Sequence, residues 1–228
     1  MRFGAPVILF DLDGTLLTFE GPGPGPGRTA LMLAMRDLYG IHDATEGIRL
    51  EGATDMGVVA TMLGRVGQVP DAEAISSVFS HYVGHLGRQL ETRTYRAIGA
   101  VDVTVAALRS AGAIVGLGTG NIREGARLKL RAAGLENYFD LDLGGYGGDS
   151  SMRSEILARA VSRCDAAPGT PVVVVGDTRH DAEAARSVGA RIVGVAATSE
   201  AFVELTQAGV ERIVKACGDE LVRFVLTP

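Results

Sequence analysis

The sequence predicts an α/β protein built on a parallel sheet with helices on both faces. Four short runs of aliphatic residues recur along the chain, and their unbroken apolar character is typical of strands buried on both sides. Helical stretches lie between these runs, which indicates strand–helix–strand units joined into one parallel sheet. The predicted strands cover residues 7–10, 114–117, 172–175 and 192–195.

The helices expected between the strands cover residues 101–111, 123–133, 153–163 and 181–188. Three of them are followed by a glycine, at Gly112, Gly134 and Gly189. Glycine is the residue usually found just past a helix end, because it adopts the left-handed backbone conformation without strain. These glycines therefore support the predicted helix ends.

A long segment, residues 18–94, separates the first two predicted strands. A crossover needs only about a dozen residues, and this segment holds three predicted helices, at 28–39, 55–66 and 72–90. We therefore expect a core domain made of residues 1–17 and 95–228 and a small α-helical cap domain made of residues 18–94. A Gly-Pro repeat at 21–27 lies in the first linker, where it is either an exposed loop or a hinge of the cap.

Composition narrows the class of protein. The chain has 228 residues, 46% of them hydrophobic and 21% charged, as in soluble globular proteins. A net charge of −5 argues against a nucleic-acid partner or an anionic membrane surface. No apolar run is long enough to span a bilayer. Two cysteines are too few for a disulfide framework, so we expect a cytoplasmic protein.

Polar clusters follow the predicted strands at four places. They are Asp11 and Asp13, then Thr119-Gly120-Asn121, then Arg153 at a helix start, and finally Gly176-Asp177-Thr178 with Asp181. Ligands of open α/β sheets bind beyond the carboxyl ends of the strands, so we expect these clusters to meet. Paired carboxylates can supply a nucleophile and an acid/base, and oxygen ligands suit Mg²⁺. The clusters together predict phosphoryl transfer.

The order of these motifs resembles the haloacid dehalogenase (HAD) superfamily. The resemblance rests on Phe10-Asp11-Leu12-Asp13-Gly14-Thr15-Leu16, on Thr119, on a cation at a helix start, and on Gly176-Asp177-Thr178 with Asp181. Within the superfamily the chain is similar to the phosphoglycolate-phosphatase-like group, through Arg28, Gly52-Ala53-Thr54-Asp55, and Thr119-Gly120-Asn121 followed by Ala126-Arg127-Leu128-Lys129-Leu130. The resemblance implies a Rossmann-like three-layer α/β/α core with a helical cap inserted after the first strand.

The resemblance also implies roles for the acidic residues. Asp11 would be the nucleophile that forms an aspartyl-phosphate. Asp13 would protonate the leaving alkoxide and later activate water. Asp11, the backbone carbonyl of Asp13, and Asp177 would bind Mg²⁺, while Asp181 would lie behind these ligands or bind the ion through water.

The phosphate-binding residues follow from the same resemblance. Thr119, with the N–H groups of Gly120 and Asn121, would hold phosphate oxygens. Most relatives place a lysine in the third motif, but residues 140–157 contain no lysine, and Arg153 is their only cation. We therefore assign the phosphate-binding cation to Arg153.

The expected function is a Mg²⁺-dependent phosphatase that hydrolyses a small phosphorylated metabolite. Asp13 separates it from dehalogenases, which lack an acid there because a halide leaves without a proton. Phosphonate hydrolases of the group need a cap lysine, and residues 1–127 contain none. Two alternatives stay open, namely a phosphosugar mutase of the same superfamily and a non-catalytic HAD-like binding domain, the second disfavoured by the intact acids. A third, an NAD-binding oxidoreductase, rests only on a weak glycine-rich match at 116–121.

Overall fold

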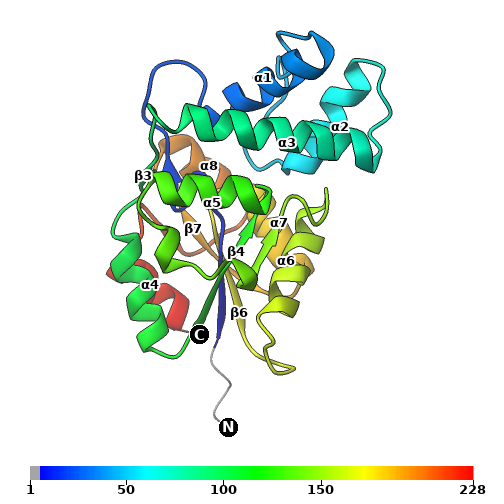
Figure 1. The fold of residues 1–228 in the computed structure, drawn as a ribbon. Coiled ribbons are helices and arrows are strands. Elements are labelled where there is room, and N and C mark those ends of the chain that lie inside the picture. The colour runs from blue at the N-terminus through cyan, green and yellow to red at the C-terminus, as the bar shows by residue number, and fades with distance from the viewer. Residues whose placement is uncertain (1–5, 228) are drawn as a thin grey trace.

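The computed structural model describes residues 6–227, so residues 1–5 and 228 of the predicted core domain lie outside the described part. A six-stranded parallel sheet forms its centre (Figure 1). In spatial order the strands are β5 (Gly144–Tyr146), β4 (Ile114–Thr119), β1 (Val7–Phe10), β6 (Val172–Gly176), β7 (Arg191–Val195) and β8 (Ile213–Val214). The predicted α/β class with a parallel sheet is confirmed.

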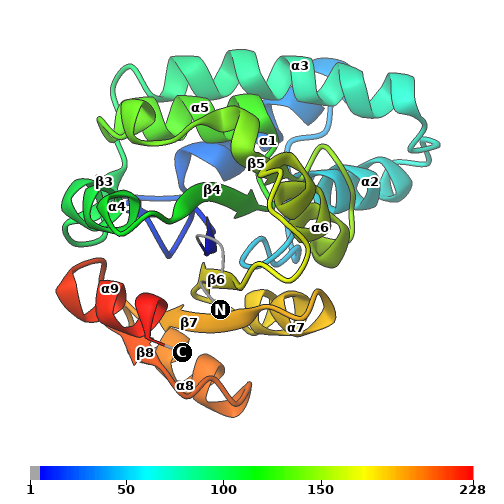
Figure 2. The same ribbon diagram turned by 90° about the horizontal axis from the view of Figure 1, so that it is seen from below.

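Helices cover both faces of the sheet (Figure 2). One face packs against α4 (Val101–Ser110), α5 (Arg123–Ala132) and α9 (Asp219–Leu226), and the other against α6 (Arg153–Arg163) and α7 (Arg179–Ser187). Side chains of β1 alternate between the faces: Ile8 and Phe10 belong to the first core, and Val7 and Leu9 to the second. This two-sided burial explains why the strand sequence is apolar throughout.

One α-helix and two 3₁₀ turns complete the described part of the core. Helix α8 (Ser199–Gln207) packs beside α7 and β7. Two 3₁₀ turns, η1 (Glu136–Tyr138) and η2 (Leu141–Leu143), precede β5. The backbone φ angles of Gly112, Gly134 and Gly189 are +87°, +72° and +68°, as expected for glycines that end helices.

Three helices of the long insertion share a hydrophobic cluster, which Ile122 of the core joins. They are α1 (Pro26–Tyr39), α2 (Asp55–Arg65) and α3 (Ala72–Gln89), and their shared core contains Met35, Met62 and Tyr82. They lie above the carboxyl ends of the central strands (Figure 1). Helix α1 begins at Pro26, two residues before the predicted start, because proline is favoured in the first turn of a helix. The end of the Gly-Pro repeat is therefore helical.

The two linkers of the insertion are joined to each other. Strands β2 (Leu17–Thr18) and β3 (Arg96–Ala97) pair antiparallel at their base. Beyond this pair, Arg93 of the second linker donates hydrogen bonds to the carbonyls of Pro22 (3.4 Å) and Pro24 (2.5 Å) in the first. Its guanidinium also lies 4.5 Å from the centre of the Phe19 ring. The Gly-Pro repeat is thus held by a side chain from the other linker.

Within residues 6–227, no helix has the length and apolar character needed to cross a bilayer. Both cysteines, Cys164 and Cys217, are buried and free.

Candidate active site

The end of β1 places Asp11 and Asp13 at the carboxyl edge of the sheet. Asp11 is buried, with 5% of its surface exposed, and its N–H bonds the carbonyl of Val175 at 2.8 Å. The chain then turns at Gly14, whose φ is +81°. A Cβ at Gly14 would collide with the carboxylate of Asp177. Glycine is therefore needed both for the turn and for the approach of the two acidic loops.

Three carboxylates meet at this edge. Oxygen atoms of Asp11, Asp177 and Asp181 lie within 4.8 Å of one another. Burial raises the pKa of Asp11 to about 6, against the opposing effect of Arg153. Burial and the charges of Asp181 and Asp11 raise the pKa of Asp177 well above its usual value. Three carboxylates beside one arginine leave an excess of negative charge. Their oxygens are ligands that suit a divalent cation such as Mg²⁺.

Arg153 is the first residue of α6, and its guanidinium reaches into this cluster. Nη2 lies 2.7 Å from Oδ1 of Asp11 and 2.7 Å from Oδ1 of Asp181, and the arginine side chain is 8% exposed. Nε donates a hydrogen bond of 2.9 Å to Asp181. Among the described residues, Nη2 is the buried side-chain nitrogen that makes no hydrogen bond of acceptable geometry. Its contacts with the two carboxylates are therefore ion pairs rather than well-aligned hydrogen bonds.

Asp181 is fixed on both oxygens. Oδ1 accepts from Arg153, while Oδ2 accepts from the N–H of Thr178 at 3.0 Å and from its hydroxyl at 2.7 Å. Together with the bond from the Asp181 N–H to the Thr178 hydroxyl, these contacts form the capping box of α7. Asp181 thus has less freedom to bind an ion directly than Asp11 or Asp177.

The loop after β4 brings the predicted phosphate-binding residues beside Asp13. Thr119 is fully buried, and its hydroxyl accepts from the side-chain amide of Asn121 at 2.9 Å. The same amide nitrogen lies 2.8 Å from Oδ2 of Asp13. A Cβ at Gly120 would collide with the carbonyl of Ala53, so this glycine lets the insertion approach the core.

Lys129 also lies in the site, although its place in the sequence indicated no role for it there. Its Nζ lies 2.6 Å from Oδ2 of Asp13 and 2.6 Å from Oδ1 of Asn121, and the residue is 5% exposed. Burial opposes its charge, but the nearby Asp13 carboxylate helps to raise its pKa well above the usual value. The signal in the sequence was its position on the buried face of α5, beside Ala126 and Leu130, where a lysine is unusual.

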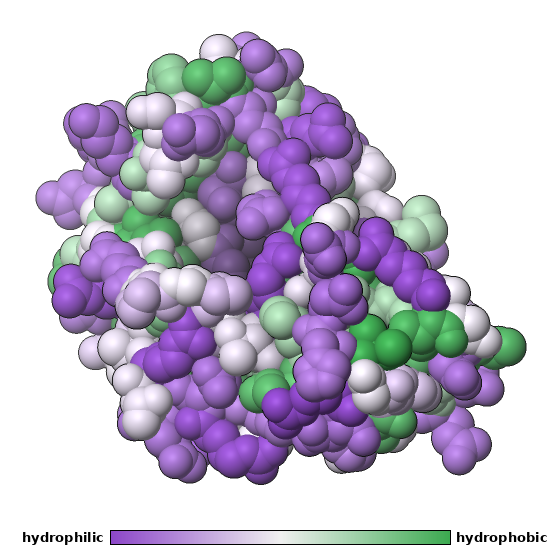
Figure 3. Space-filling model, turned by 90° about the horizontal axis from the view of Figure 1, so that it is seen from above, coloured by the Kyte–Doolittle hydropathy of each residue, from purple (hydrophilic) through white to green (hydrophobic). Residues whose placement is uncertain are grey.

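Two adjoining cavities open at this edge of the sheet. The smaller, about 170 Å³, is lined by the acidic residues Asp11, Asp13 and Asp177 together with Arg153. The other, about 290 Å³, extends from Asp13 between the core and the insertion. Seen from above, the surface of the molecule is hollowed, and hydrophilic residues surround much of the hollow (Figure 3).

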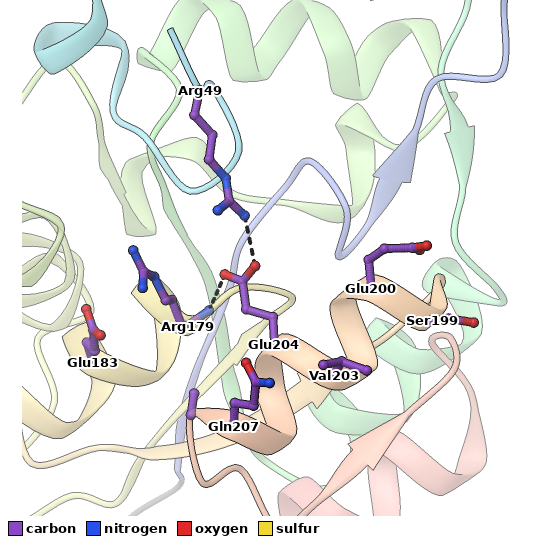
Figure 4. A pocket seen from close by; sticks show the side chains of 9 residues that line it. Arg49, Arg179, Glu183, Ser199, Glu200, Val203, Glu204 and Gln207 are labelled. Atoms are coloured by element: carbon purple, nitrogen blue, oxygen red, sulfur yellow. Dashed lines mark hydrogen bonds and ion pairs between the residues drawn. The ribbon is translucent and has the colours of Figure 1, made fainter. Parts of the chain in front are cut away.

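A larger cavity, about 680 Å³, lies apart from the acidic cluster, between residues of the insertion, α7 and α8. There the carboxylate of Glu204 accepts from Arg49 of the insertion at 2.8 Å and from the N–H of Arg179 at 3.2 Å (Figure 4). The Arg49–Glu204 ion pair therefore links the insertion to the core on this side.

The chain is similar to known hydrolases over most of its length. A family model described as haloacid dehalogenase-like hydrolase matches residues 5–189. "Probable phosphatase IndB" of Dickeya dadantii (strain 3937) is 30% identical over 200 residues, which cover 83% of this chain and 80% of that protein.

Solved structures share the fold at lower identity. The crystal structure of a hydrolase from Pseudomonas syringae superposes with a TM-score of 0.68 at 20% identity, covering 96% of this chain and 98% of the other. A predicted phosphoglycolate phosphatase from Haemophilus somnus 129pt gives a TM-score of 0.60 at 18% identity, covering 98% and 100% of the two chains.

Proposed function

The chain belongs to the haloacid dehalogenase-like hydrolase family, and from that premise we propose that it is a phosphatase, which hydrolyses a small phosphomonoester with Mg²⁺ through an aspartyl-phosphate on Asp11. The observation that carries the proposal is the setting of Asp11. Its carboxylate is buried at the carboxyl end of β1, 2.7 Å from the Arg153 guanidinium and within 4.8 Å of two further acids. A nucleophile and an anion-binding group thus share one small cavity.

Asp11, the backbone carbonyl of Asp13, and Asp177 would hold Mg²⁺. When bound, the ion neutralises the charge of the acids and of the transferring phosphoryl group. Asp181 is bonded on both oxygens, which supports a role in holding Arg153 behind the ligands rather than in direct coordination.

In the first half of the reaction, a carboxylate oxygen of Asp11 attacks phosphorus, and the bond from phosphorus to the alcohol oxygen breaks. Asp13 donates a proton to that oxygen, so the alcohol leaves neutral. In the second half, Asp13 takes a proton from water as the water oxygen attacks phosphorus, and the bond to Asp11 breaks. Inorganic phosphate leaves, and both carboxyl groups return to their starting states.

The phosphoryl oxygens are proposed to bind Arg153 and the loop of Thr119, Gly120 and Asn121. Nη2 of Arg153 supports this assignment because it is buried and makes no hydrogen bond of acceptable geometry to the described residues. An arginine can bind phosphate with two parallel N–H bonds, so it can replace a lysine here. The substrate is proposed to be a small phosphorylated metabolite of the cytoplasm, in keeping with the size of the cavities and the two free cysteines.

The test is hydrolysis of p-nitrophenyl phosphate by the purified protein with and without Mg²⁺. We expect turnover that needs Mg²⁺ and is lost when Asp11 is changed to Asn. Asp219→Asn, at an exposed position at the start of α9, is the matched control and should keep full activity. Undiminished turnover by the Asp11→Asn variant would show that Asp11 is not the nucleophile.

A further inference from the structure

The cavity of about 290 Å³ is where the leaving group of a phosphomonoester would lie. It starts at Asp13, the proposed proton donor to the leaving oxygen, and runs between the core and helices α1, α2 and α3. Its volume is near the lower end of the roughly 300–1,000 Å³ range of ligand pockets, which limits the leaving group to a small molecule. The charges on its wall therefore bear directly on which alcohol it accepts.

Both basic residues on this wall are already engaged by the protein. Lys129 binds Asp13 and Asn121 at 2.6 Å each. Arg28 uses its two terminal nitrogens to bind the carbonyls of Thr45 (3.0 Å) and Ile48 (3.1 Å), within the insertion. Each side chain thus spends two of its donors on the protein, which leaves fewer for a second anionic group on the substrate.

Acidic and basic residues on the same wall balance when Asp13 acts as the proton donor. Glu51 and Asp55 then face Arg28 and Lys129, so the lining carries no excess positive charge. A carboxylate or second phosphate on the leaving group gains no net attraction from such a wall, while it loses part of its hydration. The lining therefore favours a leaving group without a second charge.

Asp55 supplies a hydrogen-bond acceptor on the wall of this cavity, which a neutral ligand can use. Its Oδ2 accepts from the N–H of Ile122 at 2.8 Å, and its backbone N–H bonds the carbonyl of Gly120 at 2.7 Å, which fixes the start of α2 against the core. No other hydrogen bond to its carboxylate is made within residues 6–227, so its second oxygen can accept from an alcohol hydroxyl.

The rest of the wall is largely aromatic and aliphatic. Phe19, Tyr82 and Tyr95 contribute rings, and Leu31 and Val58 contribute aliphatic surface. A polyol or sugar matches such a lining, because it presents C–H groups on its faces and hydroxyl donors at its edge. We propose that this cavity selects phosphate monoesters of small, uncharged, hydroxyl-bearing alcohols and disfavours those whose leaving group carries a second anion.

This inference rests on the proposed phosphatase function and is tested with pairs of substrates of nearly equal size. 2-Hydroxyethyl phosphate and 2-phosphoglycolate differ only in a CH₂OH group against a carboxylate, as do glycerol 3-phosphate and 3-phosphoglycerate. We expect the wild-type protein to show a kcat/KM at least tenfold higher for the neutral member of each pair. Equal or faster hydrolysis of the carboxylate member would overturn the inference while leaving the phosphatase function intact.

Asp55→Asn adds a second arm, because it keeps an oxygen for the Ile122 N–H while removing the charge. We expect it to reduce the preference at least threefold, mainly through faster hydrolysis of 2-phosphoglycolate, with circular dichroism confirming the fold. Asp71→Asn is the matched control, since Asp71 caps α3 at an exposed position and should leave the ratio unchanged. An unchanged ratio in folded Asp55→Asn would refute the role of Asp55. Failure of the wild type to hydrolyse even p-nitrophenyl phosphate would instead overturn the phosphatase proposal, and this inference with it.

Discussion

Replacing Arg153 with Met should destabilise the metal-free protein far more than an ordinary surface substitution. The guanidinium is 8% exposed and lies 2.7 Å from both Asp11 and Asp181, whose side chains are 8% and 1% exposed. Met has a similar length but no charge. The variant therefore leaves three clustered carboxylates without the cation that lies among them.

The size of the expected loss of stability follows from the burial of Arg153 and its carboxylate partners. Removing one partner of a buried ion pair costs about 3–5 kcal/mol, because the other charge is left uncompensated. Proton uptake by Asp11, whose pKa is already raised to about 6 by burial, relieves part of this cost. This relief is about 1.4 kcal/mol for each unit by which the pKa changes. We therefore expect a loss of about 2–3 kcal/mol in the free energy of unfolding near pH 7.5.

Urea denaturation in EDTA and in Mg²⁺ measures this effect. Mg²⁺ at 100 times its dissociation constant stabilises a folded protein by about 2.7 kcal/mol, so the ion should recover part of the loss if it binds the acids. Arg159→Met, on an exposed position of the same helix, is the control and should change stability by no more than about 0.5 kcal/mol. A loss in EDTA no larger than that of Arg159→Met would refute the reasoning.

Three further changes test other parts of the structure. Lys129→Met should lower kcat/KM for an alkyl phosphate by about 10–100-fold, because Asp13 loses the ammonium that holds it. The kcat/KM for p-nitrophenyl phosphate should fall less, since its leaving group needs no proton. Equal losses for the two substrates would contradict this role. Gly14→Ala should cost about 1–3 kcal/mol in urea denaturation, since φ is +81° and a Cβ would meet a carboxylate. Arg49→Ala should change stability by less than about 1 kcal/mol, because Arg49 is 59% exposed, and a double-mutant cycle with Glu204→Ala measures the coupling.

The central strands could be predicted because their sequences are apolar throughout, as burial on both faces requires. Strand β5 could not, because two of its three residues are glycines, which have low strand propensity. The structure gives the reason for one of them: a Cβ at Gly145 would collide with the carbonyl of Ile156 in α6. Strand β8 was missed because it has only two residues and is defined by its pairing with β7.

The acidic residues of the site could be found in the sequence because each follows a predicted strand or opens the next helix. Lys129 neither follows a predicted strand nor opens a helix. It reaches Asp13 from the middle of α5, across 116 positions of sequence, and only the packing of that helix against the core brings the two together. The predicted boundaries of the cap domain and the roles assigned to the site residues stay predictions.

The bonds from Arg93 to the Gly-Pro repeat have a mechanical consequence. Proline has no N–H, so the repeat offers carbonyl acceptors that its own backbone has few donors to satisfy. Arg93 donates hydrogen bonds to two of these carbonyls and thereby joins the two linkers between the insertion and the core. Two linkers that are not joined would let the insertion twist and slide relative to the core as well as bend. The two joined linkers therefore move as one unit in any displacement of the insertion.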